Sequence, residues 1–174
     1  MYEKLFGKIL HAYDGSEQSS QALTLALAIA KQCGGELHIV SVGEVEYVPQ
    51  SVGDIREQEG RAAHRLRSVL HRIGAVAAEN NLKLHTHVLV GHAVRDIVAL
   101  ARELNVELLI IGAKGHSALY ERVVGSRASR IMQLAHCPVL AVKSNRRGPR
   151  VRESFKLTPA WVRSLGLRQV EPTF

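Results

Sequence analysis

Short apolar runs alternate along the chain with longer segments in which apolar residues recur every three or four positions. The first pattern is typical of buried strands and the second of amphipathic helices. The predicted strands are residues 8–13, 37–42, 84–90, 107–111 and 138–143, and the predicted helices are 22–30, a segment within 54–80, 91–104 and 127–135. This alternation predicts an α/β fold with an open five-stranded parallel sheet and helices on both faces.

Two features of this predicted sheet bear on function. His85 and His87 alternate with apolar residues in the third strand, which indicates an exposed edge. Asp14 and Gly112 each follow a predicted strand. Ligands of open parallel sheets bind beyond the carboxyl ends of the strands, where the strand order reverses. We therefore expect the binding site near Asp14 and Gly112.

The most specific motif follows the apolar run at 108–111. Gly112, Gly115, Gly125 and Ser126 form the pattern Gly-x2-Gly-x9-Gly-Ser. Glycine lets the main chain approach a ligand without a Cβ atom and permits positive φ. Ser126 is predicted to be the N-cap of the helix at 127–135, so that its hydroxyl and the first-turn amides face an anion. The motif predicts a phosphate cradle; the alternative is that Gly112 ends a strand and Gly125 opens a helix for purely local reasons.

Several segments together resemble the universal stress protein domain over residues 4–143. They are residues 9–16, 35–42, 90–112, 112–126 and 136–142. The resemblance implies a Rossmann-like sheet of order 3-2-1-4-5, a homodimer through the last strand, and the ATP-binding branch of the family. We expect ATP as the ligand, with or without Mg²⁺. It places Asp14 on the ribose hydroxyls and Val42 against the adenine. It also implies that the motif residues surround the phosphates: Gly112, Gly115, Gly125 and Ser126.

Some of these positions have alternative interpretations. Asp14 could be a helix cap, and Val42 could be an ordinary core residue. His11 and Tyr13 depart from the aliphatic residues usual in the family's first strand. We expect His11 to be a hydrogen-bonded core histidine rather than a ligand-sensing or pH-sensitive one. Tyr13 is expected to narrow the mouth of the site beside Asp14.

Composition narrows the class of protein. With 174 residues and 46% hydrophobic content, the chain is expected to form one domain with a sizeable core. It contains no apolar stretch of the length that spans a membrane, and no signal peptide is visible, so we expect a cytoplasmic protein. Cys33 and Cys137 have no metal or redox spacing. The pairs His85 with His87 and His64 with His71 each lack a third ligand, so no metal site is expected.

The charge is concentrated near the C-terminus. Residues 1–143 contain sixteen Lys and Arg against fourteen Asp and Glu, whereas residues 144–174 contain seven against two, giving net charges of +2 and +5. We therefore divide the chain into a nucleotide-binding domain at 1–143 and a basic extension at 144–174. A short helix from Thr158, carrying Trp161 and Leu165, is expected to dock on its own domain, a second protomer or a partner protein. Nucleic acid is not expected, because the extension lacks an organised basic surface.

Three functions remain open at this point. The favoured one is an adenine-nucleotide-binding stress module whose state is read by partners. The others are a dimeric scaffold that binds no nucleotide and a slow ATPase. The chain has no Gly-x4-Gly-Lys-Ser/Thr loop, no evident carboxylate pair for Mg²⁺ and no base aimed at an attacking water. No catalytic residue is therefore predicted.

Overall fold

The computed structural model describes residues 5–44, 70–71, 73–75, 77–79, 81–114 and 124–143. In chain order the elements are β1 (Lys8–Ala12), α1 (Glu17–Cys33), β2 (Glu36–Glu44), β3 (Leu84–Gly91), α3 (Ala93–Glu103), β4 (Leu108–Gly112), α4 (Ser126–Leu134) and β5 (Val139–Val142). The helix expected within 54–80 lies mostly outside the described residues, although the described part of 70–79 is helical. The extension at 144–174 also lies outside them.

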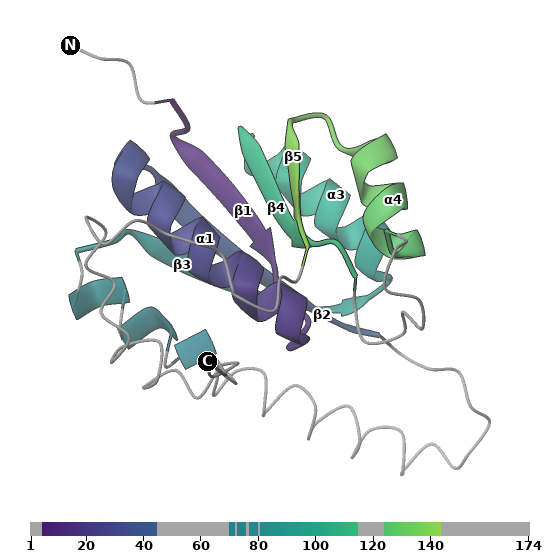
Figure 1. The fold of residues 1–174 in the computed structure, drawn as a ribbon, viewed down its shortest axis with the longest axis horizontal. Helices are drawn as coiled ribbons and strands as arrows, with labels where there is room; N and C mark the ends of the chain where they lie inside the picture. The colour runs from purple at the N-terminus through teal and green to yellow at the C-terminus, as the bar shows by residue number, and fades with distance from the viewer. Residues whose placement is uncertain are drawn as a thin grey trace, which may run out of the picture.

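The strands form one parallel sheet of order β3-β2-β1-β4-β5 (Figure 1). This confirms the predicted fold class and strand order. β3 lies at one edge of the sheet, as the alternating polar residues predicted, and β5 lies at the other. Both central strands, β1 and β4, consist largely of buried residues. Strands buried on both faces explain the continuous apolar runs in the sequence.

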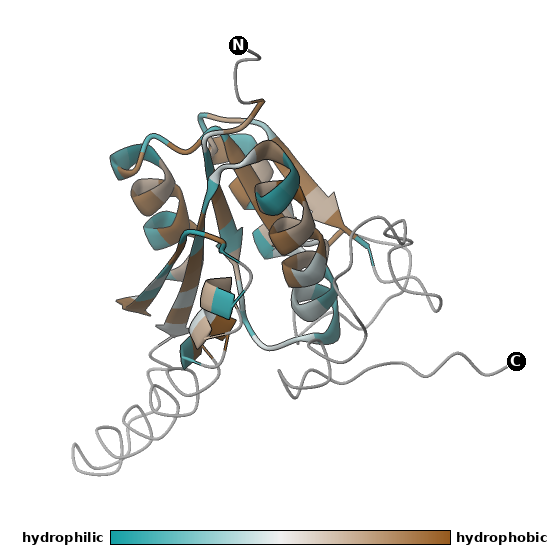
Figure 2. Cartoon of the chain, turned by 90° about the vertical axis from the view of Figure 1, so that its left-hand side faces the viewer, coloured by the Kyte–Doolittle hydropathy of each residue, from teal (hydrophilic) through white to brown (hydrophobic). Residues whose placement is uncertain are grey.

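Helices cover both faces of the sheet. On one face α1 packs with the helical residues Leu70 and Ile73 against β1, β2 and β4. On the other face α3 and α4 pack against the same strands. Figure 2 shows the mostly hydrophobic strands lying between helices on either side. Within the described ranges, no helix combines the length and apolar character needed to cross a bilayer.

Both ends of α1 follow from local chemistry. Ser16 is the N-cap, and its Oγ accepts a hydrogen bond from the main-chain nitrogen of Ser19 at 3.2 Å. Between the ends, Ala and Leu favour helix. At the other end Gly34 adopts left-handed geometry with φ 62° and caps the helix. The helix therefore ends at the glycine pair, as predicted, and returns the chain to β2 beside β1.

Candidate functional site

The strand order reverses between β1 and β4. These two strands pair in parallel, with Ala12 opposite Ile111, but β1 is followed in the chain by β2 on one side, whereas β4 is followed by β5 on the other. A crevice outside the carboxyl ends of two such strands is where open α/β sheets bind ligands. Asp14 follows β1 and Gly112 ends β4, so both lie at the carboxyl ends of these two strands, as predicted.

Asp14 is exposed at the entrance to α1. Its Oδ1 accepts a hydrogen bond from the main-chain nitrogen of Ser16 at 2.9 Å. Because Ser16 is the N-cap, the alternative interpretation of Asp14 as the cap is wrong. The carboxylate instead orders the turn before the helix and remains exposed at the carboxyl end of β1. A carboxylate near a helix N-terminus is also favoured by the helix dipole.

Gly112 lies against the first turn of α1. A Cβ atom added there would lie 3.0 Å from the nitrogen of Ser19 and 3.2 Å from the carbonyl carbon of Gln18. Just beyond the strand, the nitrogen of Lys114 donates to Oε1 of Gln18 at 2.8 Å. The missing side chain therefore brings the end of β4 close to α1. The packing of β4 against α1 therefore explains a glycine at position 112 without a ligand, which is the alternative interpretation of the motif.

The start of α4 differs from the prediction. Gly125 is the N-cap, with φ −61° and ψ 150°, and Ser126 is the first helical residue. The prediction that Ser126 is the N-cap is therefore wrong by one position. Because glycine has no side chain, α4 begins without a side-chain cap hydrogen bond. Ser126 is exposed, so its side chain lies on the surface at the helix entrance.

Gly125 ties the start of α4 to the end of β4. Its main-chain nitrogen donates to the oxygen of Ala113 at 2.8 Å. Ala113 and Gly125 are thus joined at the carboxyl end of β4. At any helix N-terminus the first amides cannot pair within the helix, and α4 has no side-chain cap hydrogen bond there. Gly115 lies outside the described residues. Neither Gly112 nor Gly125 has positive φ, so backbone conformation does not explain glycine at these two positions.

Val42 lies near the end of β2, on the face covered by α3 and α4. It is half-buried and packs against the apolar cluster of that face. Ala12 pairs with Val40, so continuing the register places Val42 level with Asp14. The structure therefore brings the carboxyl ends of β1, β2 and β4 together with the start of α4. The first turn of α1 also lies at this end of the sheet, in contact with the end of β4.

His11 and Tyr13 belong to the core. His11 is fully buried, and its Nδ1 donates to the main-chain oxygen of Ile110 at 3.1 Å. Burial lowers its pKa to about 4, and hydrogen bonds to nearby main-chain groups raise it only in part. The ring is therefore neutral near pH 7. The interpretation of His11 as a hydrogen-bonded core histidine is confirmed. Tyr13 is 6% exposed and packs in the apolar cluster on the α1 side of the sheet.

Comparison with known proteins agrees with this architecture. The model of the universal stress protein family matches residues 5–143. The chain belongs to the universal stress protein family. It is 32% identical over 149 residues to a universal stress protein of Methanocaldococcus jannaschii, covering 81% of this chain and 84% of the relative. It is also 32% identical to universal stress protein YxiE of Bacillus subtilis, covering 80% of this chain and all of the relative.

Solved structures of this family share the fold of the chain. The universal stress protein UspA of Lactobacillus plantarum superposes with a TM-score of 0.72 at 22% identity, covering 78% of this chain and 97% of that protein. A universal stress protein in complex with cAMP gives a TM-score of 0.62 at 24% identity, with coverage of 80% and 99%. An Arabidopsis thaliana family member with AMP bound gives 0.56 at 15% identity, with coverage of 79% and 92%.

Proposed function

We propose that this universal stress protein binds an adenine nucleotide, ATP with Mg²⁺, at the crevice between β1 and β4. In this proposal it acts as a cytoplasmic regulatory module whose nucleotide state is read by partner proteins. The observation that carries the proposal is the meeting of Asp14, the end of β4 and the start of α4 where the strand order reverses. That combination offers an acceptor for hydroxyl groups and amides for an anion at one edge.

Each proposed contact matches the chemistry of its residue. The carboxylate of Asp14 accepts hydrogen bonds from the ribose hydroxyls, and the aliphatic side chain of Val42 forms one wall for the adenine. The phosphates lie over the main chain at the motif glycines and at the N-terminus of α4, where the helix dipole favours negative charge. The phosphate contacts come from Gly112, Gly115, Gly125 and Ser126.

Two kinds of observation support the choice of ligand. The solved family structures that contain cAMP and AMP point to adenine nucleotides as a class. The choice of ATP within that class rests on the Gly-x2-Gly-x9-Gly-Ser pattern and on exposed Arg127 and Arg130 in α4, which attract a polyphosphate more strongly than a monophosphate.

A dimeric scaffold without nucleotide is the second candidate function. The observation in its favour is Gly112, whose missing Cβ is already required by the packing of β4 against α1. The glycine at this position would therefore be retained even in a protein with no ligand. The two candidates are separated by nucleotide binding itself.

Calorimetry on the full chain provides the test. ATP with Mg²⁺ is expected to bind with one site per chain, more tightly than AMP or cAMP. Asp14→Asn should weaken ATP binding at least tenfold, which corresponds to about 1.4 kcal/mol and is within the range of a hydrogen bond to a charged group. Glu103→Gln is the matched control. This exposed carboxylate is the last residue of α3 and lies near the amino ends of the strands, away from the proposed nucleotide site.

A second variant addresses the phosphates. Because Gly125 is the N-cap, Ser126→Ala should leave thermal stability unchanged and weaken ATP binding several-fold through the lost hydroxyl contact. Absence of any heat or thermal shift with millimolar ATP and Mg²⁺ would reject the proposal in favour of the scaffold. Equal affinities for ATP and AMP would retain the adenine site but reject the assignment of the polyphosphate contacts.

A further inference from the structure

Three histidines and a glutamate gather on one face of the sheet at the β3 edge. The parallel register of β2 and β3 places His38 opposite His85, and the next same-face pair is Val40 with His87. Glu36 precedes His38 by two residues, so its side chain points to the same face. These residues lie in the first halves of their strands. The cluster is therefore near the amino ends of the strands, away from the crevice proposed for the nucleotide.

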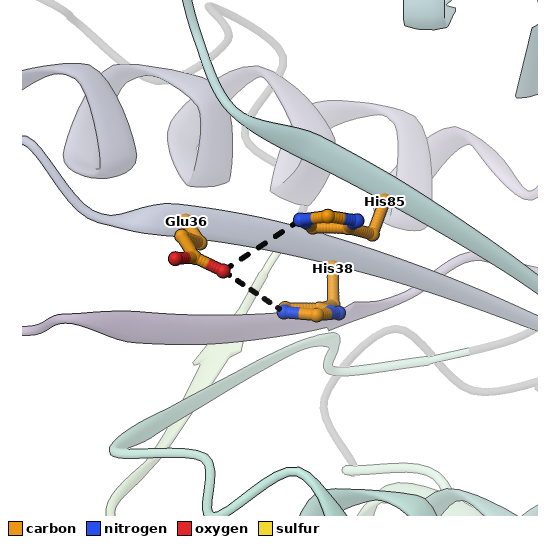
Figure 3. Close-up of side chains that lie close together, drawn as sticks. All are labelled: Glu36, His38 and His85. Carbon is orange, nitrogen blue, oxygen red and sulfur yellow. Dashed lines mark ion pairs between the residues drawn. The ribbon is translucent and has the colours of Figure 1, made fainter.

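Three of these side chains converge on a common point. Oε2 of Glu36 lies 3.6 Å from Nε2 of His85 and 3.9 Å from Nε2 of His38 (Figure 3). One ligand atom from each of the three residues lies within 4.8 Å of the others. The rings of His38 and His85 are stacked, with centroids 4.6 Å apart and an interplanar angle of 18°. Both rings thus present the same edge to the carboxylate.

His38 has a fixed orientation and an unused nitrogen. Its Nδ1 lies 3.0 Å from Nε2 of His87, so one ring donates to the other. When His38 is the donor, its Nε2 keeps a lone pair directed at Glu36. That nitrogen is buried and has no hydrogen-bond partner among the described residues. A buried polar atom without a partner is costly, and such atoms often mark a missing ligand.

We propose that Glu36, His38 and His85 bind one divalent transition-metal ion, with Zn²⁺ as the best match. Two imidazole nitrogens and one carboxylate oxygen form a donor set that zinc accepts, leaving a fourth position for water or an external ligand. His87 acts as the outer partner that orients His38, in the way that metal-bound histidines commonly donate their second N–H. The site is independent of the proposed nucleotide function.

The distances are compatible with a metal once the exposed side chain of His85 moves toward His38. Two ligands of a tetrahedral zinc ion, each bonded at about 2.1 Å, are separated by about 3.4 Å. The two oxygen–nitrogen distances of 3.6 and 3.9 Å are within about half an ångström of this value. The ligand nitrogens of His38 and His85 lie within 4.8 Å of each other, so these two rings approach by up to about 1.4 Å when both bind the ion. The side chain of His85 is 52% exposed on an edge strand, so it can rotate and also leaves a route for the ion to enter.

Lys83 and Lys8 are neighbouring cations that act against the ion, and Lys83 is the one paired with a proposed ligand. Nζ of Lys83 lies 3.8 Å from Oε1 of Glu36, but the lysine side chain is 77% exposed and can move into solvent at little cost. The proposal therefore predicts that Lys83→Ala increases metal affinity. This expectation distinguishes a metal site from a simple ion-pair network, in which removal of the lysine has no such effect.

The test uses the full chain freed of metal with a chelator. Co²⁺ is added as a spectroscopic probe and Zn²⁺ is titrated by calorimetry. We expect one ion per chain, visible absorption bands typical of tetrahedral Co²⁺, and displacement of Co²⁺ by Zn²⁺. Glu36→Gln and His85→Ala should each lower the affinity at least tenfold, and His87→Gln should lower it about 10- to 100-fold through the orientation of His38.

His136→Gln is the matched control, because His136 is exposed and lies outside the cluster, before β5. It should bind Co²⁺ and Zn²⁺ as the unmodified protein does. His85→Ala replaces an exposed side chain, so it is not expected to disturb folding, and its melting temperature without metal checks this directly. The proposal is overturned by the absence of stoichiometric binding at micromolar metal, or by equal affinities for the unmodified protein, Glu36→Gln and His85→Ala.

Discussion

The imidazole of His11 in β1 is hydrogen-bonded across the sheet to the main-chain oxygen of Ile110 in β4, at 3.1 Å from Nδ1. The two residues are also register partners, so the side chain reinforces the pairing of the two central strands. Full burial lowers the pKa of His11 to about 4, and the ring remains neutral over the physiological range. A neutral histidine thus lies at the centre of the sheet, beneath the candidate nucleotide site.

The first prediction is a loss of stability in mild acid. Unfolded His11 binds a proton near pH 6.5, whereas the folded form does so only near pH 4. The unfolded state therefore carries more bound protons between these values, and the free energy of unfolding should fall as pH drops from about 6.5 to 4, by an amount on the order of 3 kcal/mol. Urea unfolding measured across this pH range checks the slope.

His11→Leu is the informative variant for this prediction. It removes the titrating group, so the slope of stability against pH should be shallower than in the unmodified protein, whatever the change at neutral pH. His136→Gln, at an exposed position, should leave the slope unchanged. An unaltered slope in His11→Leu would show that other groups account for the acid sensitivity.

The second prediction compares two glycines of opposite character. Gly112→Ala places a Cβ atom 3.0 Å from the nitrogen of Ser19, a main-chain atom, and should destabilise the protein by about 1–3 kcal/mol without any ligand. Gly74 is helical and has no atom within 4 Å of the same position. Gly74→Ala should therefore stabilise the protein by about 0.5–1 kcal/mol. Thermal and urea unfolding measure both changes, and equal signs would contradict the packing described for Gly112.

The third prediction concerns Gly115, which lies outside the described residues. Gly115→Val introduces a branched side chain where the proposed phosphates need bare main chain, so ATP affinity should fall more than tenfold while the fold is retained. Calorimetry measures the affinity, and far-ultraviolet circular dichroism controls for folding. Unchanged affinity would mean that this segment does not contact the phosphates.

The fourth prediction is a homodimer formed along β5. This short apolar strand is at the edge of the sheet, and its open side is a pairing surface. The main-chain oxygens of Pro138 and Val142 accept hydrogen bonds from β4 and its flanking residue. Backbone groups of successive strand residues point to alternate sides, so the N–H of Ala141 points to the open side. Ala141→Pro should therefore remove an intermolecular donor while preserving the pairing with β4.

Sedimentation at micromolar concentration distinguishes the outcomes for β5. The unmodified protein and the control Ala141→Ser should be dimers, and Ala141→Pro should be monomeric or dissociate at much lower concentration. A monomeric unmodified protein would reject the dimer, and a dimeric Ala141→Pro protein would assign the interface to another surface.

The fifth prediction concerns the basic extension. Truncation after Lys143 should leave ATP affinity within a few-fold but lower the melting temperature or change the oligomer, because an isolated short helix is marginal in water and order there requires a docking surface. Emission from Trp161, the only tryptophan in the chain, reports directly on docking. Loss of nucleotide binding with unchanged assembly would place the extension in the site, and emission typical of a hydrated indole would show that it is undocked.

Local patterns determined the elements of the fold. The apolar runs identified the strands of the sheet, and Gly34 marked the end of α1, because strand burial and helix termination depend on neighbouring residues. The alternation of polar residues around His85 and His87 also identified β3 as an edge strand. The predicted start of α4 was wrong by one residue. Serine is preferred over glycine as an N-cap, so the sequence favoured Ser126, whereas Gly125 is the N-cap in the structure.

Contacts between distant segments were decided only by the tertiary structure. Along the sequence, His85 has only His87 as a neighbouring ligand. Glu36 and His38 are about fifty residues away and reach His85 only through the register of β2 and β3. In the same way, the close approach of Gly112 to the first turn of α1, which leaves little room for a Cβ atom, depends on helix packing and is not visible in the sequence. Residue type and spacing specify the strands and helices, whereas sheet register and helix packing determine which side chains share a site.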